Sequence, residues 1–189
     1  SSIEITGEKD SQQTYRIVGD PTEGALLVAA AKAGAAYVEV NQAYPRENEV
    51  PFDSERKRMI TVHDVSQPDP NDFSPFYDEE TKGWDVIAVK GAPDIVLNLC
   101  TRYQDSSDQP QPMDENVRKR ILDANEAMTK DALRVLGLAY RLDKNVPDNP
   151  DDLKTDELEK DLVFAGLIGM IDPARTEVKP ALEKAREAG

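Results

Sequence analysis

Four short apolar runs, separated by polar segments, dominate the pattern of the chain, and each has the length of a β-strand. In one of them Val86, Ala88 and Lys90 fall on one face and the residues between them on the other, as the two-residue period of a strand requires. The last run is apolar throughout, which is typical of a buried strand. We predict a hairpin arm at 59–62 within the segment 50–65, and strands at 84–90, 133–140 and 162–171.

Capping residues and helical periodicity predict helices between and after these strands. Asp20 precedes Pro21 and is followed three residues later by Glu23, a combination typical of a helix start with a capping box. This helix is predicted to run to about Gly34. Three further helices are predicted: a short one from Pro93 to near Cys100, a longer one capped by Asp114 with Val117, Ile121, Ala124 and Met128 at helical spacing, and one at 176–189.

The polar segments between these elements are predicted to be loops. Residues 66–80 are rich in proline and aspartate, and residues 141–161 hold eight acidic and four basic residues with two prolines. We expect the second segment to be a solvated loop with at most a short helix. Because helices do not alternate one-for-one with strands, the predicted fold class is α+β, with an antiparallel β-sheet flanked by helices.

Composition excludes several classes of protein. The chain has 189 residues, 39% of them hydrophobic, which fits one sizeable soluble core with a short extension. It contains neither an apolar run of about 18 residues nor a secretion signal. A net charge of -14 would repel nucleic acid. The single Cys100 and single His63 permit neither an internal disulfide nor a histidine-rich metal site, which fits a cytosolic, reducing compartment.

One aromatic ring and several cations form a candidate binding site for a purine and its phosphates. Phe52 has Pro51 and a charged run as neighbours, so we interpret it as an exposed ring available for stacking. Lys90 ends a strand before Gly91, which would let a ligand approach the backbone closely. Arg134 lies inside an apolar strand and must be paired or face a ligand. ATP is therefore the first candidate ligand.

Each of these residues also has a structural interpretation. Phe52 fits an ordinary edge-strand aromatic, and Lys90 a solvated lysine at a strand end. Arg134 fits a salt bridge to one of the many carboxylates. Glu23 serves either the capping box or a purine, whose amino proton its carboxylate would accept.

The cations at 56–58 leave two placements open. Strand alternation would direct Arg56 and Arg58 to the face of Phe52, and Lys57 to the face of Met59, unless the segment turns. A solvated basic patch is the alternative. No P-loop, G-x-S-x-G, Cys-x-x-Cys or H-E-x-x-H motif accompanies them, so nucleophilic and zinc chemistry have no support. His63 and Cys100 are accordingly interpreted as structural.

Five motifs occur in the order and approximate spacing of one known family, and together they cover nearly the whole chain. They are Gly-Asp-Pro-Thr-Glu-Gly-Ala-Leu at 19–26, the segment 52–59, Lys-Gly-Ala-Pro at 90–93, Arg134, and Asp-Pro-Ala-Arg at 172–175. The chain resembles the nucleotide-binding (N) domain of P-type cation-transporting ATPases, in particular the type II calcium and sodium/potassium pumps. Heavy-metal pumps carry a His-Pro dipeptide in this domain, whereas His63 is followed by Asp64.

The resemblance implies a role for ten residues of an ATP site. They are Phe52 stacking on adenine, Glu23 bonding its amino group, Lys57 and Lys90 flanking the nucleotide, Arg134 reaching the phosphates, and Asp20, Thr22, Met59, Gly91 and Ala92 lining the pocket. Two positions depart from the family pattern. Ser54 replaces a basic residue that calcium pumps often have, and Ala174 replaces the second proline of the hinge motif.

The resemblance also divides the chain and limits its chemistry. Residues 1–171 would be the N domain without its upstream start, and residues 172–189 the hinge and the beginning of the phosphorylation domain. The family's Asp-Lys-Thr-Gly-Thr, Thr-Gly-Asp and Gly-Asp-Gly motifs are absent from the sequence. This fragment is therefore expected to bind ATP or ADP and to hydrolyse nothing, with no catalytic residue and no metal site of its own.

The implied parent is an ATP-driven cation translocase of the cell membrane, which uses Mg²⁺ with ATP. Its cytoplasmic N domain would present ATP to an aspartate of the phosphorylation domain and would also meet the actuator domain. The fragment alone is expected to be soluble and monomeric. The alternative function is a non-catalytic acidic protein-interaction module that docks a basic partner through 66–80. A complete small phosphotransferase would need a nucleophile and metal carboxylates in one cleft.

Overall fold

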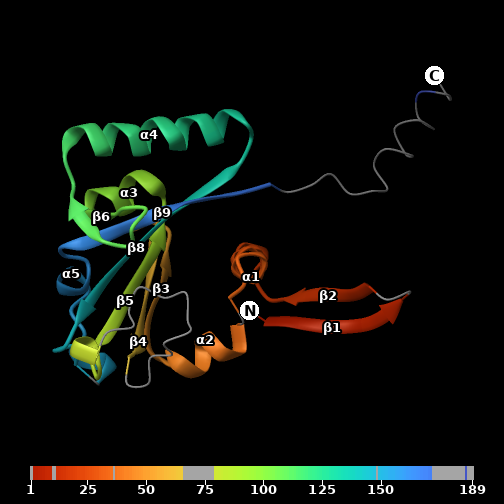
Figure 1. Ribbon diagram of the computed structural model, residues 1–189, viewed down its shortest axis with the longest axis horizontal. Helices are drawn as coiled ribbons and strands as arrows, with labels where there is room; N and C mark the ends of the chain where they lie inside the picture. The colour runs from red at the N-terminus through yellow and green to blue at the C-terminus, as the bar shows by residue number, and fades with distance from the viewer. Residues whose placement is uncertain are drawn as a thin grey trace.

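The computed structural model describes residues 2–9, 12–35, 37–65, 79–147, 149–171 and 186 (Figure 1). The strands within these residues are β1 (Ser2–Lys9), β2 (Gln12–Val18), β3 (Arg46–Asp53), β4 (Arg58–Asp64), β5 (Asp85–Gly91), β6 (Cys100–Gln104), β7 (Pro110–Pro112), β8 (Arg134–Asp143) and β9 (Leu162–Met170). The helices are α1 (Pro21–Lys32), α2 (Tyr37–Ala43), α3 (Pro93–Asn98), α4 (Glu115–Lys130) and α5 (Thr155–Leu158), with 3₁₀ turns at Glu79–Thr81 and Pro150–Asp152.

Seven of these strands form one sheet in the order β3-β4-β5-β8-β9-β6-β7. Neighbouring strands are antiparallel except β6 and β9, which run parallel. Parallel pairing needs a long crossover, and here β7, α4, β8 and α5 lie between the two strands. The predicted α+β class is confirmed, although the sheet is mixed rather than wholly antiparallel. Strands β1 and β2 pair with each other in a separate hairpin beside α1 (Figure 1).

The large sheet buries apolar side chains on both faces. Ile87 and Val89 of β5 belong to one buried cluster, together with Val96 of α3. Val86 belongs to a second cluster, together with Tyr44, which follows α2. Because successive side chains of a strand alternate between faces, α3 and the end of α2 cover opposite sides of the sheet. The face assignment predicted for the strand at 84–90 is confirmed.

The helix starts predicted from Pro93 and from the cap Asp114 are confirmed. Helix α3 begins at Pro93, and the Asp114 carboxylate accepts a hydrogen bond from the backbone N–H of Val117 at the start of α4, at 2.7 Å. Helix α1 ends at Lys32, two residues before the predicted end. Gly34 follows with a left-handed φ of 92°, a conformation that helix C-termini favour and that glycine adopts without strain.

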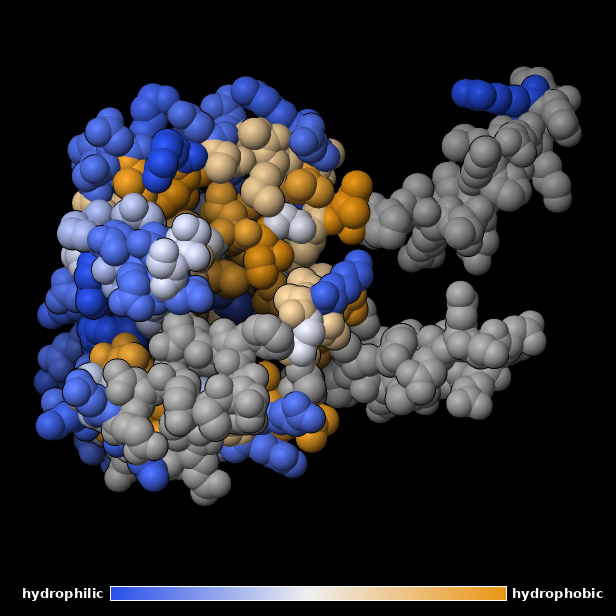
Figure 2. All heavy atoms as spheres, in the orientation of Figure 1, coloured by the Kyte–Doolittle hydropathy of each residue, from blue (hydrophilic) through white to orange (hydrophobic). Residues whose placement is uncertain are grey.

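The apolar face of α4 lies over β6, β8 and β9. Val117, Ile121, Ala124 and Met128 share a hollow of about 410 Å³ with Phe164 of β9. In Figure 2 apolar side chains gather beneath α4 on the face in view. The face predicted from helical spacing is therefore the one turned toward the sheet.

Two segments differ from the sequence prediction. Residues 141–143 continue β8, and Leu158 and Glu159 are buried at 4% and 5% exposed, although 141–161 was expected to be a solvated loop. That expectation is wrong at these positions. The segment is so rich in charged residues that its composition gives no sign of one leucine in the core and one buried, paired glutamate. The polar first residues form the β1–β2 hairpin, and α2, β6 and β7 occupy segments in which no element was predicted.

Some predictions lie outside the described residues. These are most of the loop at 66–80, the hinge motif at 172–175, and the helix at 176–189 apart from residue 186. Within the described ranges, no helix combines the length and the apolar character needed to cross a membrane.

Candidate functional site

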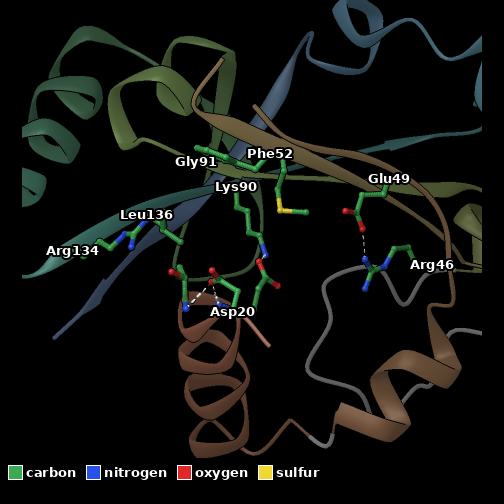
Figure 3. Close-up of a pocket in the computed structure, with 11 residues that line it drawn as sticks. Asp20, Arg46, Glu49, Phe52, Lys90, Gly91, Arg134 and Leu136 are labelled. Atoms are coloured by element: carbon green, nitrogen blue, oxygen red, sulfur yellow. Dashed lines mark hydrogen bonds and ion pairs between the residues drawn. The ribbon is translucent and has the colours of Figure 1, made fainter. Parts of the chain in front are cut away.

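A cavity of about 560 Å³ lies where β3 and β5 end and β4 and β8 begin, with the start of α1 across from the sheet (Figure 3). This volume is in the range of small-molecule sites. Eight of the ten residues predicted for the site line it, namely Asp20, Thr22, Glu23, Phe52, Met59, Lys90, Gly91 and Arg134. Three further residues line it that were not predicted, namely Arg46, Glu49 and Leu136.

Strand register places the sheet side of the cavity. Met59 of β4 is paired with Lys90 of β5, and Lys90 is paired with Leu138 of β8. Directly opposite residues project on the same face of a sheet, and the two-residue period carries that face along β8 to Leu136 and Arg134. The cavity therefore lies on the Lys90 face, which is the face opposite α3.

The start of α1 forms the other wall. The Asp20 carboxylate accepts hydrogen bonds from the backbone N–H groups of Thr22, at 2.8 Å, and Glu23, at 3.2 Å. The bond from Glu23, followed by that from Thr22, lowers the pKa of Asp20, and the Arg134 cation acts in the same direction. Asp20 is thus an ionised helix cap beside a cation, and Figure 3 places Arg134 at this end of the cavity.

Glu23 and Lys90 form an ion pair across the cavity. The Lys90 ammonium donates a hydrogen bond to the Glu23 carboxylate (Figure 3). The Glu23 side chain is 37% exposed and that of Lys90 23%. The pair therefore remains within reach of water and of a ligand. It links the first turn of α1 to the end of β5.

Phe52 lies on the edge strand β3 and is 62% exposed. Its ring belongs to the cavity lining together with Met59 of the neighbouring strand. A large aromatic side chain on an edge strand, with most of its surface in water, offers a face for stacking. The exposure expected from the charged neighbours of Phe52 is confirmed.

Gly91 has a packing role that differs from the predicted one. A Cβ atom at this position would lie 2.4 Å from the backbone oxygen of Lys57 and 2.8 Å from the Cα of Arg58. The glycine therefore lets the β3–β4 turn rest on β5, and the predicted close approach of a ligand stays a prediction.

Lys57 and Ala92, both predicted for the site, do not line the cavity. Lys57 has a left-handed φ of 55° and an exposed side chain at the β3–β4 turn. Its backbone oxygen accepts a hydrogen bond from the N–H of Ala92, at 3.0 Å. The two residues therefore connect the turn to the strand that carries Lys90.

Comparison with known sequences shows the family of the chain. A sequence model of the family described as "P-type ATPase, cytoplasmic domain N" matches residues 1–177. The chain belongs to this family. Similar proteins include "Calcium-transporting ATPase 1" of Lactococcus lactis, which is 35% identical over an alignment of 190 positions that covers 100% of this chain and 19% of the relative. "Calcium-transporting ATPase 1" of Bacillus cereus is 38% identical over 171 residues, or 90% and 17% of the two chains. The N domain described here thus spans less than a fifth of the length of these relatives.

Arg56 and Arg58 of this N domain do not face the cavity with Phe52, and the strand-alternation prediction is wrong for them. The segment turns at residues 54–57, and both guanidinium groups donate hydrogen bonds to the buried carboxylate of Glu159. Burial raises the pKa of Glu159, but the bonds from Arg58 and Arg56 outweigh it, so the pKa is lowered overall. The bond to Glu159 likewise raises the pKa of Arg58. The solvated-patch alternative is also wrong, since two of the three cations are paired.

Three lining residues of the N domain were missed from the sequence. Leu136 follows Arg134 by two residues on β8, so strand alternation was a usable signal for it. Arg46 and Glu49 form an ion pair at the opposite end of the cavity from Arg134 (Figure 3). Their spacing of three residues on an irregular part of β3 matches no strand pattern, so no local signal singled them out.

His63 and Cys100 lie away from the cavity and make contacts within the fold. The ring nitrogens of His63 hydrogen-bond the backbone oxygen of Tyr44 and the hydroxyl of Thr61, and burial lowers its pKa. The buried Cys100 thiol donates to the backbone oxygen of Val96, and burial raises its pKa to about 12. In the part of the chain that the structure describes, no three His, Cys, Asp or Glu residues are grouped to hold a metal ion.

Proposed function

We propose that this N domain binds ATP or ADP in the cavity and presents ATP to an aspartate on another domain of a membrane cation pump. The observation that carries the proposal is the convergence of an exposed ring and two cations on one space. Phe52, Lys90 and Arg134 come from three different strands and line the same cavity. Membership of the P-type ATPase N-domain family supports the same ligand.

The lining offers a partner for each part of a nucleotide. Phe52 would stack on adenine, which would cover apolar surface that now faces water. Met59 and Leu136 supply further apolar contacts on the sheet side. Arg134, whose guanidinium suits phosphate oxygens, would hold the phosphate end. Lys57 would flank the nucleotide only from the exposed turn outside the lining.

Glu23 and Lys90 would exchange partners when nucleotide binds. Their ion pair occupies the two groups that the adenine amino group and the phosphates would need. A partly exposed pair is worth about 1 kcal/mol or less, so a ligand that satisfies both charges can replace it. The carboxylate of Glu23 would then accept a hydrogen bond from the adenine amino group, and Lys90 would donate to the nucleotide.

The charges of the lining predict weak binding. The cavity holds three carboxylates and three cations, which are Asp20, Glu23, Glu49, Arg46, Lys90 and Arg134. Because these charges balance, a polyanion gains little net attraction. We expect a dissociation constant of about 1 mM or somewhat tighter for the isolated chain.

In the parent pump the reaction would take place on another domain. Residues 1–171 would hold the nucleotide, and residues 172–189 would form the hinge and the start of the phosphorylation domain. Closure of the hinge would place the γ-phosphate against the aspartate, while Mg²⁺ would neutralise charge on the phosphates. The N domain would therefore lie in the cytoplasm beside the phosphorylation and actuator domains, and alone it would hydrolyse nothing.

Nucleotide titration followed by amide NMR tests the proposal on the 189-residue chain. We expect ADP and ATP to bind with similar affinity, because the γ-phosphate is left for the other domain, and to shift the amides of Phe52, Lys90 and Arg134. Tenfold preference for GTP, or shifts that avoid these residues, would contradict the assignment. Phosphate release above background at saturating ATP and Mg²⁺ would show that the fragment is catalytic.

A further inference from the structure

Glu159 is 5% exposed, an unusual environment for a carboxylate. It follows α5, three residues before β9, and receives hydrogen bonds from two arginines that lie 101 and 103 residues earlier in the chain. Arg58 binds it through two nitrogens, with its Nε 2.8 Å from Oε1, and Arg56 donates to the same Oε1. Two-nitrogen arginine–carboxylate contacts define orientation as well as distance.

These contacts bear on the turn between β3 and β4. A third nitrogen of Arg58 donates to the backbone oxygen of Arg56, at 2.9 Å, so the side chain also fastens the turn itself. The Asp53 carboxylate accepts from the backbone N–H groups of Glu55, at 2.9 Å, and Arg56, at 2.7 Å. The turn is therefore held from inside by Asp53 and from the body of the domain by Glu159.

The same turn positions one wall of the cavity. The carbonyl of Lys57 accepts from Ala92 and lies so close to Gly91 that a methyl group there would overlap it. Phe52 immediately precedes Asp53, whose carboxylate caps the turn. Met59 immediately follows Arg58, whose side chain fastens the turn from the other end. The placement of this ring and thioether beside Lys90 thus depends on how the turn rests on β5.

We propose that Glu159 is a positioning residue for nucleotide binding. It holds Arg56 and Arg58 so that the turn stays on Gly91 and keeps Phe52 and Met59 at the cavity before a nucleotide arrives. Glu159 touches no ligand in this role. Its contribution is preorganisation, because a turn that had to be ordered on binding would subtract that cost from affinity. The inference rests on the proposed nucleotide site.

The test compares Glu159→Gln with Glu157→Gln in the 189-residue chain. Each substitution removes one negative charge, and the two positions are two residues apart in the chain. The Glu157 carboxylate, however, is 64% exposed and pairs only loosely with Lys154, at 3.6 Å. ADP affinity is measured well below the unfolding temperature of each variant, together with amide shifts without nucleotide. We expect Glu159→Gln to weaken ADP binding about fivefold and to shift the amides of residues 53–58 and 91–92. Glu157→Gln should match the wild type in both measurements.

Each outcome decides one question. A folded Glu159→Gln chain that binds ADP like the wild type, or whose shifts are confined to α5 and β9, would overturn the proposal. Should that variant fail to fold, Arg56→Lys is the second test, because it keeps the Arg58–Glu159 contact. Arg56→Lys should weaken ADP binding about twofold and shift amides in the same turn. Unchanged affinity and unchanged shifts in this variant would overturn the proposal. If the wild type binds no ADP, the proposed function fails, and the ligand-free amide shifts still report whether Glu159 holds the turn.

Discussion

Two groups of opposite charges flank the turn between β3 and β4, and they differ in their access to water. In the closed cluster, Glu159 is 5% exposed and its partners Arg58 and Arg56 are 17% and 25% exposed. In the open pair, Glu23 is 37% exposed and Lys90 23%. The closed cluster has three hydrogen bonds to one carboxylate, whereas the open pair has a single contact.

This difference separates charges that hold the fold from charges that a ligand can use. Glu159, Arg56 and Arg58 are outside the cavity lining, and three hydrogen bonds would have to break before a ligand could use their charges. Glu23 and Lys90 line the cavity and need break only one bond to turn toward a ligand. The closed cluster should therefore control stability and act on affinity only through the position of the turn, whereas the open pair should act on affinity directly.

The largest effect is expected from Gly91→Ala, which pushes the turn of the closed cluster off β5. The added Cβ would lie 2.4 Å from the oxygen of Lys57, and its close neighbours are backbone atoms and the Cβ of Arg58, which cannot swing aside as the end of a long side chain would. We expect a loss of about 3 kcal/mol of unfolding free energy, measured by urea denaturation, together with weaker ADP binding.

Gly137→Ala is the matched control, because Gly137 is the strand partner of Gly91 on β8. Its nearest contact for a Cβ is 3.0 Å, to the Cα of Pro93 on the face away from the cavity. Its cost should be smaller and ADP binding should not change. Equal losses of unfolding free energy and ADP affinity in both variants would show that the packing of the turn on Gly91 matters no more than the packing at Gly137.

The second prediction concerns the pH dependence of the closed cluster. The pKa of Glu159 is lowered in the folded chain from its ordinary value of 4.5. Its stabilisation is therefore fully present above that value and is lost as the pH falls through the lower folded pKa. We expect Glu159→Gln to cost about 2 kcal/mol at pH 7, less than for a fully buried pair because the arginines keep some water. The difference from the wild type should close in acid.

Urea denaturation of both chains across this pH range measures the difference directly. Glu23→Gln is the open-pair control and should cost less than about 1 kcal/mol at pH 7. If the stability difference between the wild type and Glu159→Gln stayed constant into acid, the stabilisation by the closed cluster would not come from the charge of the Glu159 carboxylate.

Local pattern was sufficient for the parts of the fold whose cause is local. The two-residue period of β5 correctly placed Val86 and Ile87 on opposite faces, and the Asp114 cap located the start of α4. By contrast, Glu159 was assigned to a solvated loop because its partners are about a hundred residues away. No window of sequence contains both ends of such a contact.

The site was predictable to a similar extent and for related reasons. Family motifs located Phe52, Lys90 and Arg134, all of which line the cavity. They did not reveal that Lys90 is already paired with Glu23, since that contact joins a helix to a strand 67 residues later. The packing of the turn on Gly91 was also not predicted, because it depends on a contact with residues more than thirty positions earlier in the chain.

The third prediction concerns the cation of the open pair. Lys90→Ala should weaken ADP binding about tenfold, since a charge-assisted hydrogen bond to the nucleotide is lost. Lys90→Arg should not restore binding, because a planar fork does not replace a compact ammonium beside Gly91. Calorimetric titration gives the affinities, and thermal melting should show little change. A large loss of stability with unchanged affinity would assign this pair to the fold instead.

The smallest effect is expected from Phe52→Ala, which leaves both groups of charges in place. Stacking of an aromatic ring is worth about 0.5–1.5 kcal/mol beyond the area it buries, so ADP binding should weaken several-fold. Stability should change by less than about 0.5 kcal/mol, because the side chain is 62% exposed. Phe164→Ala is the contrasting control, since that ring is 3% exposed in the core and its removal should cost about 3–5 kcal/mol. A collapse of thermal stability in Phe52→Ala with ADP affinity retained would assign the ring to packing rather than to the nucleotide.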